Sequence, residues 1–134
     1  MGESYFERAG GESPDHGRFV SLEDEVRPLA IAPGLAVRPV FGRNMTLSFV
    51  WLDPHSAAPV HEHAEEQMGT IIDGSLEFEL CGEKRLLRRG DVYVVPPFVS
   101  HGAVTGDEPC LCLDAFSPPR EALRRAAQPA RPPG

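Results

Sequence analysis

Three histidines and one glutamine carry most of the chemical information in this chain. His61 and His63 stand two residues apart, Gln67 follows shortly after them, and His101 lies further along the sequence. Imidazole nitrogens and a carboxamide oxygen can bind a transition metal. We therefore interpret the four residues as the ligands of one divalent metal ion. The spacing excludes the helical His-Glu-x-x-His zinc-protease motif, in which the two histidines stand four residues apart.

Strand geometry would bring these ligands together. Alternate side chains of a strand share a face, so the paired histidines would both point the same way. Gln67 begins a second apolar run after a short reversal of the chain. Glu66 is the neighbouring alternative to Gln67, but it should face the opposite side and stay outside the site. Glu62 and Glu65 are interpreted as solvated charges.

The surrounding segments predict a series of short antiparallel strands. Leu76–Leu80 alternates apolar with acidic residues, and Val92–Val95 is an apolar run closed by two prolines. Asp73 and Gly74 predict a two-residue hairpin turn, and a second turn is expected over Cys81–Lys84. Strands and turns at this density predict an antiparallel sandwich or a small barrel.

Strands are also expected on the N-terminal side. The candidates are Leu35–Val40 and Thr46–Leu52, separated by a turn at Gly42–Asn44, and Phe19–Leu22 is expected to form an ordered strand. Trp51 shares a face with two other large apolar residues of its strand. We expect that face to be core or subunit interface.

The chain resembles the cupin family in both of that family's motifs. The first motif runs His-x-His, three residues, Glu, six residues, Gly, and the second runs Gly, five residues, Pro-x-Gly, two residues, His. The matching positions here hold His61, His63, Gln67 and Gly74 for the first motif, and Gly90, Pro96, Phe98 and His101 for the second. The resemblance covers roughly residues 19–119. It implies an all-β fold, a single-domain cupin-type antiparallel β-barrel (double-stranded β-helix or jelly roll) with a short C-terminal helix at most.

Three positions depart from the family pattern. His55 replaces the glycine that opens the first motif, and Phe98 replaces the central glycine of the second, so both bear on turn geometry. Gln67 replaces the usual ligand Glu. Four neutral ligands leave the double positive charge of the ion uncancelled, which favours Lewis-acid chemistry. Imidazole-rich sites suit zinc, nickel, iron or copper; we expect zinc, nickel or iron, with manganese less favoured.

A second group of candidate residues lies near the end of the barrel. Residues 110–116 alternate with period two, and the inward face is left open because both faces are largely apolar. With the following Ser-Pro-Pro-Arg, this segment resembles a subgroup of single-domain cupins that includes the uronate-linearising protein of pectin and alginate degradation. That resemblance implies that Asp114 is a catalytic acid/base, and that Phe116 and Arg120 bind substrate, Arg120 through a carboxylate. The alternative is an Asp–Arg pair at a strand end with Phe116 in the core.

Two classes of function follow. The first is a metal-dependent isomerase, lyase or cyclase acting on a small oxygenated substrate, carboxylate-bearing and sugar-acid-like or polyketide-like, by Lewis-acid and acid/base chemistry. An iron-dependent dioxygenase is the alternative chemistry. The second class is a non-catalytic cupin that binds a small ligand or a metal. Asp114 and Arg120 beside an open metal site exceed what a simple binder needs, so we favour an enzyme.

Length and charge restrict the partners. A chain of 134 residues makes one domain with a sizeable core. Its net charge of −7 argues against nucleic acid and anionic membranes as partners, and a small-molecule substrate is expected instead. No apolar run approaches the length of a membrane span. The N-terminus lacks the layout of a secretory signal, so the cytoplasm is the expected compartment.

The cysteines and the two ends complete the expectations. Cys81, Cys110 and Cys112 are odd in number, which fits reduced thiols, and we expect all three to be small buried hydrophobes. The chain is divided into a flexible N-terminal arm (1–17), a cupin barrel (18–119) and a short helix with a Pro-rich tail (120–134). Cupins commonly pair through their sheets, so a homodimer is expected by analogy. His55 is expected to be a turn residue.

Overall fold

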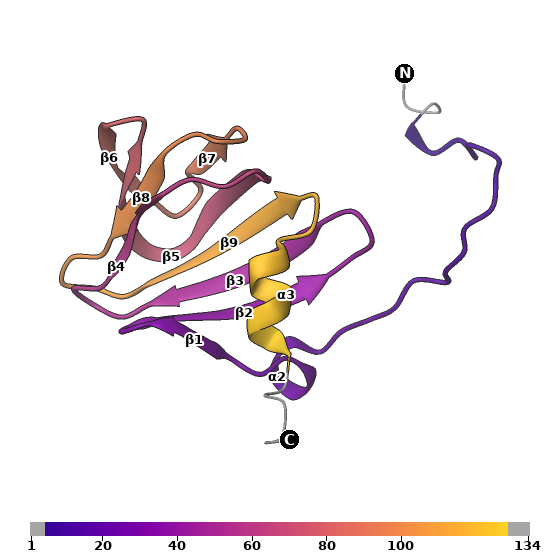
Figure 1. Ribbon diagram of the computed structural model, residues 1–134, viewed down its shortest axis with the longest axis horizontal. Coiled ribbons are helices and arrows are strands. Elements are labelled where there is room, and N and C mark those ends of the chain that lie inside the picture. The colour runs from indigo at the N-terminus through magenta and orange to yellow at the C-terminus, as the bar shows by residue number, and fades with distance from the viewer. Residues whose placement is uncertain (1–4, 129–134) are drawn as a thin grey trace, which may run out of the picture.

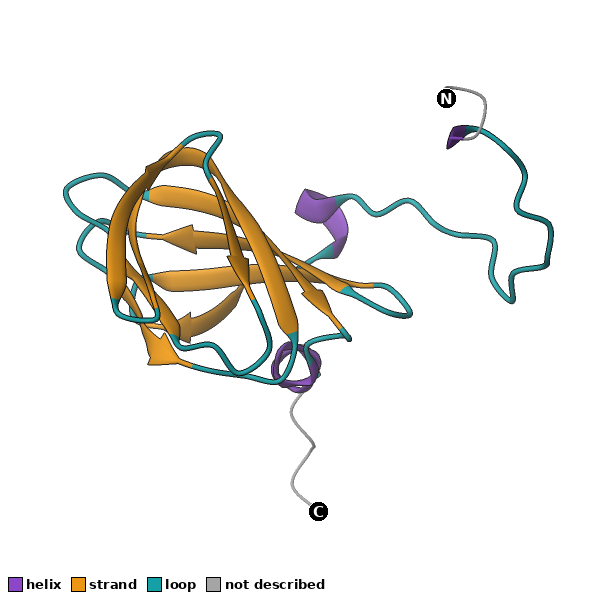
Figure 2. Cartoon of the chain, turned by 90° about the horizontal axis from the view of Figure 1, so that it is seen from above, coloured by secondary structure: helices purple, strands orange, loops and turns teal. Residues whose placement is uncertain are grey.

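Antiparallel strands curl into a barrel in the computed structural model, which describes residues 5–128 (Figures 1 and 2). The elements in chain order are α2 (Leu22–Glu25), β1 (Leu29–Ala32), β2 (Leu35–Phe41), β3 (Thr46–Leu52), β4 (Ala57–His61), β5 (Glu66–Leu80), β6 (Glu83–Arg88), β7 (Val92–Val95), β8 (His101–Val104), β9 (Cys110–Ser117) and α3 (Glu121–Ala127). The nearly all-β, antiparallel architecture confirms the expected cupin fold. In Figure 1 the segment before α2 runs away from the barrel.

The strands pair in the order β1-β2-β3-β9-β5-β8-β4, and β6 and β7 pair with opposite parts of β5. The first half of β5 pairs with β7 and β9, and its second half with β6 and β8. One long strand therefore belongs to both walls of the barrel. This continuity brings the ligand-bearing ends of β4, β5 and β8 to one side.

The core follows the period-two alternation of the strands. In β3 every second side chain from Thr46 to Leu52 is buried, starting with Thr46. Leu47 and Trp51, on the other face, are exposed. In β9 the face that bears Cys110 and Asp114 is the inward one, which settles the orientation that the sequence left open. Trp51 is thus surface rather than core.

The hairpin expected at Asp73 and Gly74 is wrong. The chain continues as β5 through both residues, because β9 stays paired with them at Leu111 and Cys110, and the register shifts between Ile71 and Asp73. Gly74 has a φ of 83°, and a Cβ there would overlap the backbone of the chain before β9. A bulge at Ile72 and the left-handed Gly74 that follows it therefore lie where the strand passes from one wall to the other.

The strand expected at Phe19–Leu22 is also wrong. The chain forms the short helix α2 instead, because the Ser21 side chain accepts a hydrogen bond from the Asp24 backbone N–H and caps the helix. Phe19 is fully exposed. The short strand β1 was missed by the sequence analysis, since two of its four residues are alanines with little β propensity.

The turn at Cys81–Lys84 is confirmed, and Cys81 with Gly82 joins β5 to β6. Cys81 is exposed there, so the expectation of burial is wrong for this thiol and right for Cys110 and Cys112. The helix expected near the C-terminus is present as α3. Within residues 5–128 no helix has the length and apolar character needed to cross a membrane.

Candidate metal centre

The three histidines of the motifs converge although they come from different segments. His61 ends β4 and His101 begins β8, and the two are paired in register. Their ring centroids lie 4.4 Å apart, and His63 lies 4.9 Å from His101 and 5.5 Å from His61. One nitrogen from each ring lies within 4.8 Å of the others. His63 stands in the loop after β4, so strand alternation, as expected from the sequence, does not explain its position.

Backbone hydrogen bonds fix which nitrogen of each ring carries the proton. Nδ1 lies 2.8 Å from the Pro59 carbonyl oxygen in His61 and 2.8 Å from the Val99 carbonyl oxygen in His101. In His63 it lies 3.0 Å from the carbonyl oxygen of Glu65. A carbonyl oxygen can only accept, so each Nδ1 donates, and each Nε2 is left with a free lone pair. This is the arrangement in which histidines bind metal through Nε2.

The unsatisfied atoms of the site fit a cation. His101 Nε2 is buried and has no hydrogen-bond partner among residues 5–128. His63 Nε2 lies 3.0 Å from Gln67 Oε1, so two acceptors face each other. Two ligand atoms that each lie about 2.1 Å from one metal ion, at a right angle to each other, would be about 3.0 Å apart. The four residues therefore have the chemistry and the proximity of a metal-binding set.

The buried histidines are held neutral, which a ligand must be. Burial, followed by the charge of Arg120, lowers the pKa of His63, and burial is also the main cause that lowers the pKa of His101. Neutral imidazoles do not have to lose a proton when they bind an ion near pH 7.

Asp114 lies beside this set, in a row of register partners on neighbouring strands in which Gly69 stands between Tyr93 and Asp114. Gly69 of β5 is the register partner of both Tyr93 in β7 and Asp114 in β9. A Cβ at Gly69 would overlap the Asp114 carboxylate and the Tyr93 ring. The missing side chain therefore lets the Tyr93 hydroxyl reach over β5 and donate a short hydrogen bond to Asp114.

The environment of Asp114 brings its titration close to neutrality. Burial raises the pKa of Asp114 to about 6, although hydrogen bonds from Tyr93 and Gln67 act in the opposite direction. Burial also raises the pKa of Tyr93, so its hydroxyl keeps its proton and serves as a donor. The Gln67 carboxamide points its oxygen towards His63 and its amide towards Asp114. A glutamate at this position would place a second carboxylate against Asp114.

Arg120 and Phe116 complete this side of the cavity. Arg120 stands at the N-cap position of α3. Its Cζ lies 5.9 Å from the Phe116 ring centroid, and its guanidinium is 3.3 Å from a carboxylate oxygen of Glu65. The Glu65 side chain is 14% exposed. Glu65 is therefore not the solvated charge that the sequence analysis expected; the arginine from the far end of the chain buries it. Glu62 and Glu66 are exposed, as expected.

The two glycine replacements lie in left-handed turns. His55 has a φ of 55° and Phe98 a φ of 62°, values that glycine adopts without strain. His55 is exposed, bonded to Asp107 at 3.0 Å, and outside the cavity, which agrees with a turn residue. The Phe98 backbone N–H donates to the His63 carbonyl oxygen at 2.8 Å and so ties this turn to the metal loop.

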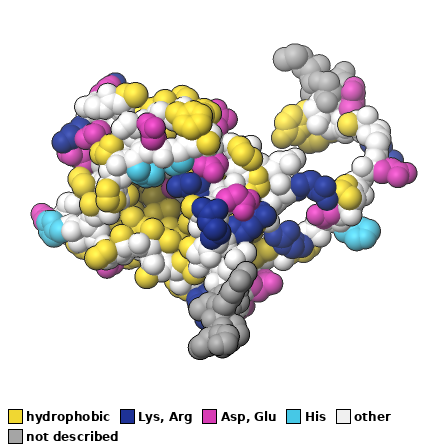
Figure 3. Space-filling model, viewed as in Figure 1, with side chains coloured by type: hydrophobic (Ala, Val, Ile, Leu, Met, Phe, Trp, Pro, Cys, Tyr) yellow, Lys and Arg dark blue, Asp and Glu magenta, His cyan; other side chains and the backbone are white. Residues whose placement is uncertain are grey.

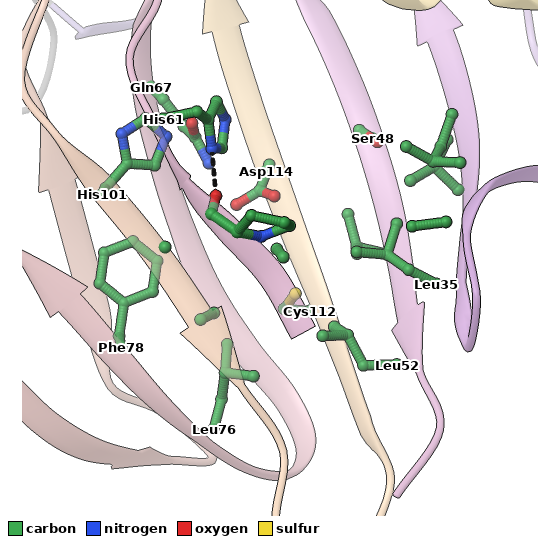
Figure 4. Close-up of a pocket in the computed structure, with 18 of the residues that line it drawn as sticks. Leu35, Ser48, Leu52, His61, Gln67, Leu76, Phe78, His101, Cys112 and Asp114 are labelled. Atoms are coloured by element: carbon green, nitrogen blue, oxygen red, sulfur yellow. Dashed lines mark hydrogen bonds between the residues drawn. The ribbon is translucent and has the colours of Figure 1, made fainter. Parts of the chain in front are cut away.

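A cavity of about 400 Å³ opens beside the candidate ligands. Figure 4 shows His61, Gln67 and His101 grouped at one end of it with Asp114 close by, and Leu35, Leu52, Leu76 and Phe78 around the remainder. Figure 3 shows the hollow from outside, lined with hydrophobic side chains and bordered by histidine and basic side chains. All seven site residues named from the sequence line this cavity.

Two further lining residues were missed. Tyr93 sits in an apolar run whose alternation could have shown that it faces inward, but its partner could not be read from the sequence. Ser48 lies opposite Asp114 in register on β3, and its hydroxyl is buried with no hydrogen-bond partner in the described part of the chain. Both Cys110 and Cys112 belong to the hydrophobic core, and of the two only Cys112 also lines the cavity.

Comparison with known proteins agrees with this geometry. A family model described as Cupin domain matches residues 48–116, and the chain belongs to this family. The pectin degradation protein KdgF of Dickeya dadantii (strain 3937) is 38% identical over 61 residues, 45% of this chain and 56% of that protein. Auxin-binding protein ABP19b of Prunus persica is 31% identical over 104 residues, 71% of this chain and 50% of that protein. The chain spans about half the length of these curated relatives.

Similarity to a pectin degradation protein extends over more of the chain in a solved structure. The structure of KdgF from Halomonas sp. has a TM-score of 0.75 and 31% identity, and the match covers 81% of this chain and 99% of that one. Within the cupin family, the chain therefore resembles the pectin-degradation proteins.

Proposed function

We propose that this cupin is a metal-dependent enzyme of the isomerase, lyase or cyclase type that acts on a small, oxygenated, carboxylate-bearing molecule. One observation carries the proposal: three Nε2 lone pairs and a carboxamide oxygen converge next to a buried carboxylate whose pKa is about 6. Such a carboxylate can accept or donate a proton near neutral pH. Its position beside the ligand set favours catalysis over storage of an ion.

The residues of the chain have separate roles in this proposal. His61, His63, Gln67 and His101 hold one divalent ion, which when bound supplies Lewis-acid chemistry at a substrate oxygen. Asp114 moves the proton, and Tyr93 holds the carboxylate in place through its hydroxyl. Arg120 binds a substrate carboxylate; a guanidinium has five N–H donors, so its contact with Glu65 leaves donors for a ligand.

Two alternatives keep the same cavity. Iron-dependent oxygenation is the alternative chemistry, since imidazole ligands also suit iron. A non-catalytic binder is the alternative class, and the relative named as an auxin-binding protein is the observation in its favour. Oxygen uptake by iron-loaded protein on addition of a ligand would support the first alternative, and ligand binding without any product would support the second.

The test compares the metal-loaded parent with the Asp114→Asn variant on a panel of small carboxylic acids. Product is followed by NMR and binding by calorimetry. The parent should convert at least one compound, chelation should abolish conversion, and the variant should still bind while its turnover falls at least about a hundredfold. Turnover of the variant at the parent rate would remove Asp114 from the mechanism.

A further inference from the structure

The walls of the cavity are apolar almost everywhere away from the candidate ligands. Six side chains of its inner wall are Leu35, Val37, Val50, Leu52, Leu76 and Phe78, each at most 9% exposed. The same residues belong to the main hydrophobic cluster of the barrel. The cavity therefore extends from the metal site into the hydrophobic interior.

Polar atoms are confined to one part of the lining. The histidines, Gln67, Asp114 and Arg120 lie together at the candidate metal centre. Beyond them the Tyr93 hydroxyl is already used by Asp114. Ser48 alone offers a buried hydroxyl that has no partner within residues 5–128. The lining can thus satisfy a polar end and one additional oxygen of a ligand, and little more.

A sugar acid does not match this distribution. Galacturonate carries hydroxyl groups on nearly every carbon, and each hydroxyl that loses water without finding a partner weakens binding by roughly tenfold. An alkyl or aromatic body loses no hydrogen bonds in the same space and gains from burial. Size is no obstacle, since a dry cavity of roughly 150 Å³ already takes up a benzene ring.

We propose that the site takes carboxylic acids whose body is apolar, alkyl or aromatic, with the oxygenated end at the metal centre and the body against the inner wall. This inference rests on the proposed function for the orientation of the ligand. It departs from the sugar-acid substrate that the resemblance to pectin-degradation proteins implies. It selects the polyketide-like end of the substrate range over the sugar-acid end.

A homologous series of ligands tests the inference directly. Dissociation constants are measured by calorimetry for acetate, butanoate, hexanoate and octanoate, and for galacturonate, with zinc-loaded and with metal-free protein. Hexanoate and galacturonate are matched, because both are six-carbon carboxylates. Affinity should rise about fourfold for each methylene buried, and hexanoate should bind at least tenfold more tightly than galacturonate. A flat series, or tighter binding of galacturonate, would overturn the inference.

A pair of variants locates the apolar body. Ala32 is half-buried and lines the cavity, whereas Ala30 of the same strand is exposed and does not. Ala32→Phe should fill the space and abolish the dependence on chain length while acetate binding stays unchanged, and Ala30→Phe should behave as the parent. If Ala32→Phe does not fold, the series with the parent still decides.

Zinc binding and the dependence of affinity on chain length are measured separately, so this inference and the proposed function can fail independently. If zinc binds but affinity does not rise along the series, the metal centre stands and the apolar substrate is wrong. If zinc does not bind but affinity still rises along the series, the apolar cavity stands and the metal-dependent enzyme is wrong.

Discussion

Replacing Asp114 by Asn should stabilise the metal-free protein at pH 8. Burial raises the pKa of the carboxyl from 3.8 to about 6, so the folded protein binds this proton more tightly than the unfolded chain does. Well below pH 3.8 both states hold the proton and there is no penalty. As the pH rises through 6, ionisation of the buried group costs the parent up to about 3 kcal/mol, at 1.36 kcal/mol per pKa unit.

Asparagine never ionises and keeps an oxygen that can accept from Tyr93. The gain of Asp114→Asn over the parent should therefore be near zero at about pH 3 and grow to about 3 kcal/mol at pH 8, a rise of roughly 10 °C in melting temperature. Urea or thermal unfolding in the presence of a chelator measures it. Asp73→Asn is the control, because Asp73 is exposed and lies on β5, the strand paired with that of Asp114; it should show no such gain. A variant less stable than the parent at pH 8, or a pH-independent difference, would show that ionisation of Asp114 does not destabilise the folded protein.

Three further predictions follow from contacts around the site. Tyr93→Phe removes a hydrogen bond that lowers the pKa of Asp114, so the pH at which the same curve levels off should move above 6; an unchanged position would show that the bond does not act on the carboxylate. Gln67→Glu adds a second negative charge beside Asp114; metal-free protein should lose about 1–3 kcal/mol at pH 8, while competition with a chelator should show tighter metal binding. The homodimer stays a prediction: Trp51 and Met68 are 43% and 47% exposed on the outer sheet face, so light scattering should give a dimer for the parent and a monomer for Trp51→Glu, and a monomeric parent would contradict it.

The sequence was informative wherever local pattern determines structure. The alternation in Leu76–Leu80 and in residues 110–116 predicted strands correctly, and the motif spacing named the histidines that the barrel brings together. Long-range contacts were not predictable in this way. The burial of Glu65 depends on Arg120, 55 residues away, and the contact between Tyr93 and Asp114 depends on the register of three strands.

Two local errors have the same origin in competing interactions. The turn pattern at Asp73 and Gly74 did not make a hairpin because β9 stays paired with β5 as far as Gly74, and a bulge at Ile72 takes up the irregularity. An apolar segment ending at Leu22 did not become a strand because the Ser21 side chain caps a helix there. In both cases a hydrogen bond that the pattern does not encode decided between two allowed backbone conformations.

The metal content of the protein and of two histidine variants decides whether the candidate centre binds an ion. The parent, His101→Ala and His55→Ala are each equilibrated with zinc, nickel or iron(II), dialysed, and analysed for metal per chain. His55 is a matched control, because it is exposed and lies outside the cavity. Close to one ion per chain is expected for the parent and for His55→Ala, and a large loss is expected for His101→Ala. A parent that retains no ion, or a His101→Ala variant that retains as much as the parent, would contradict it.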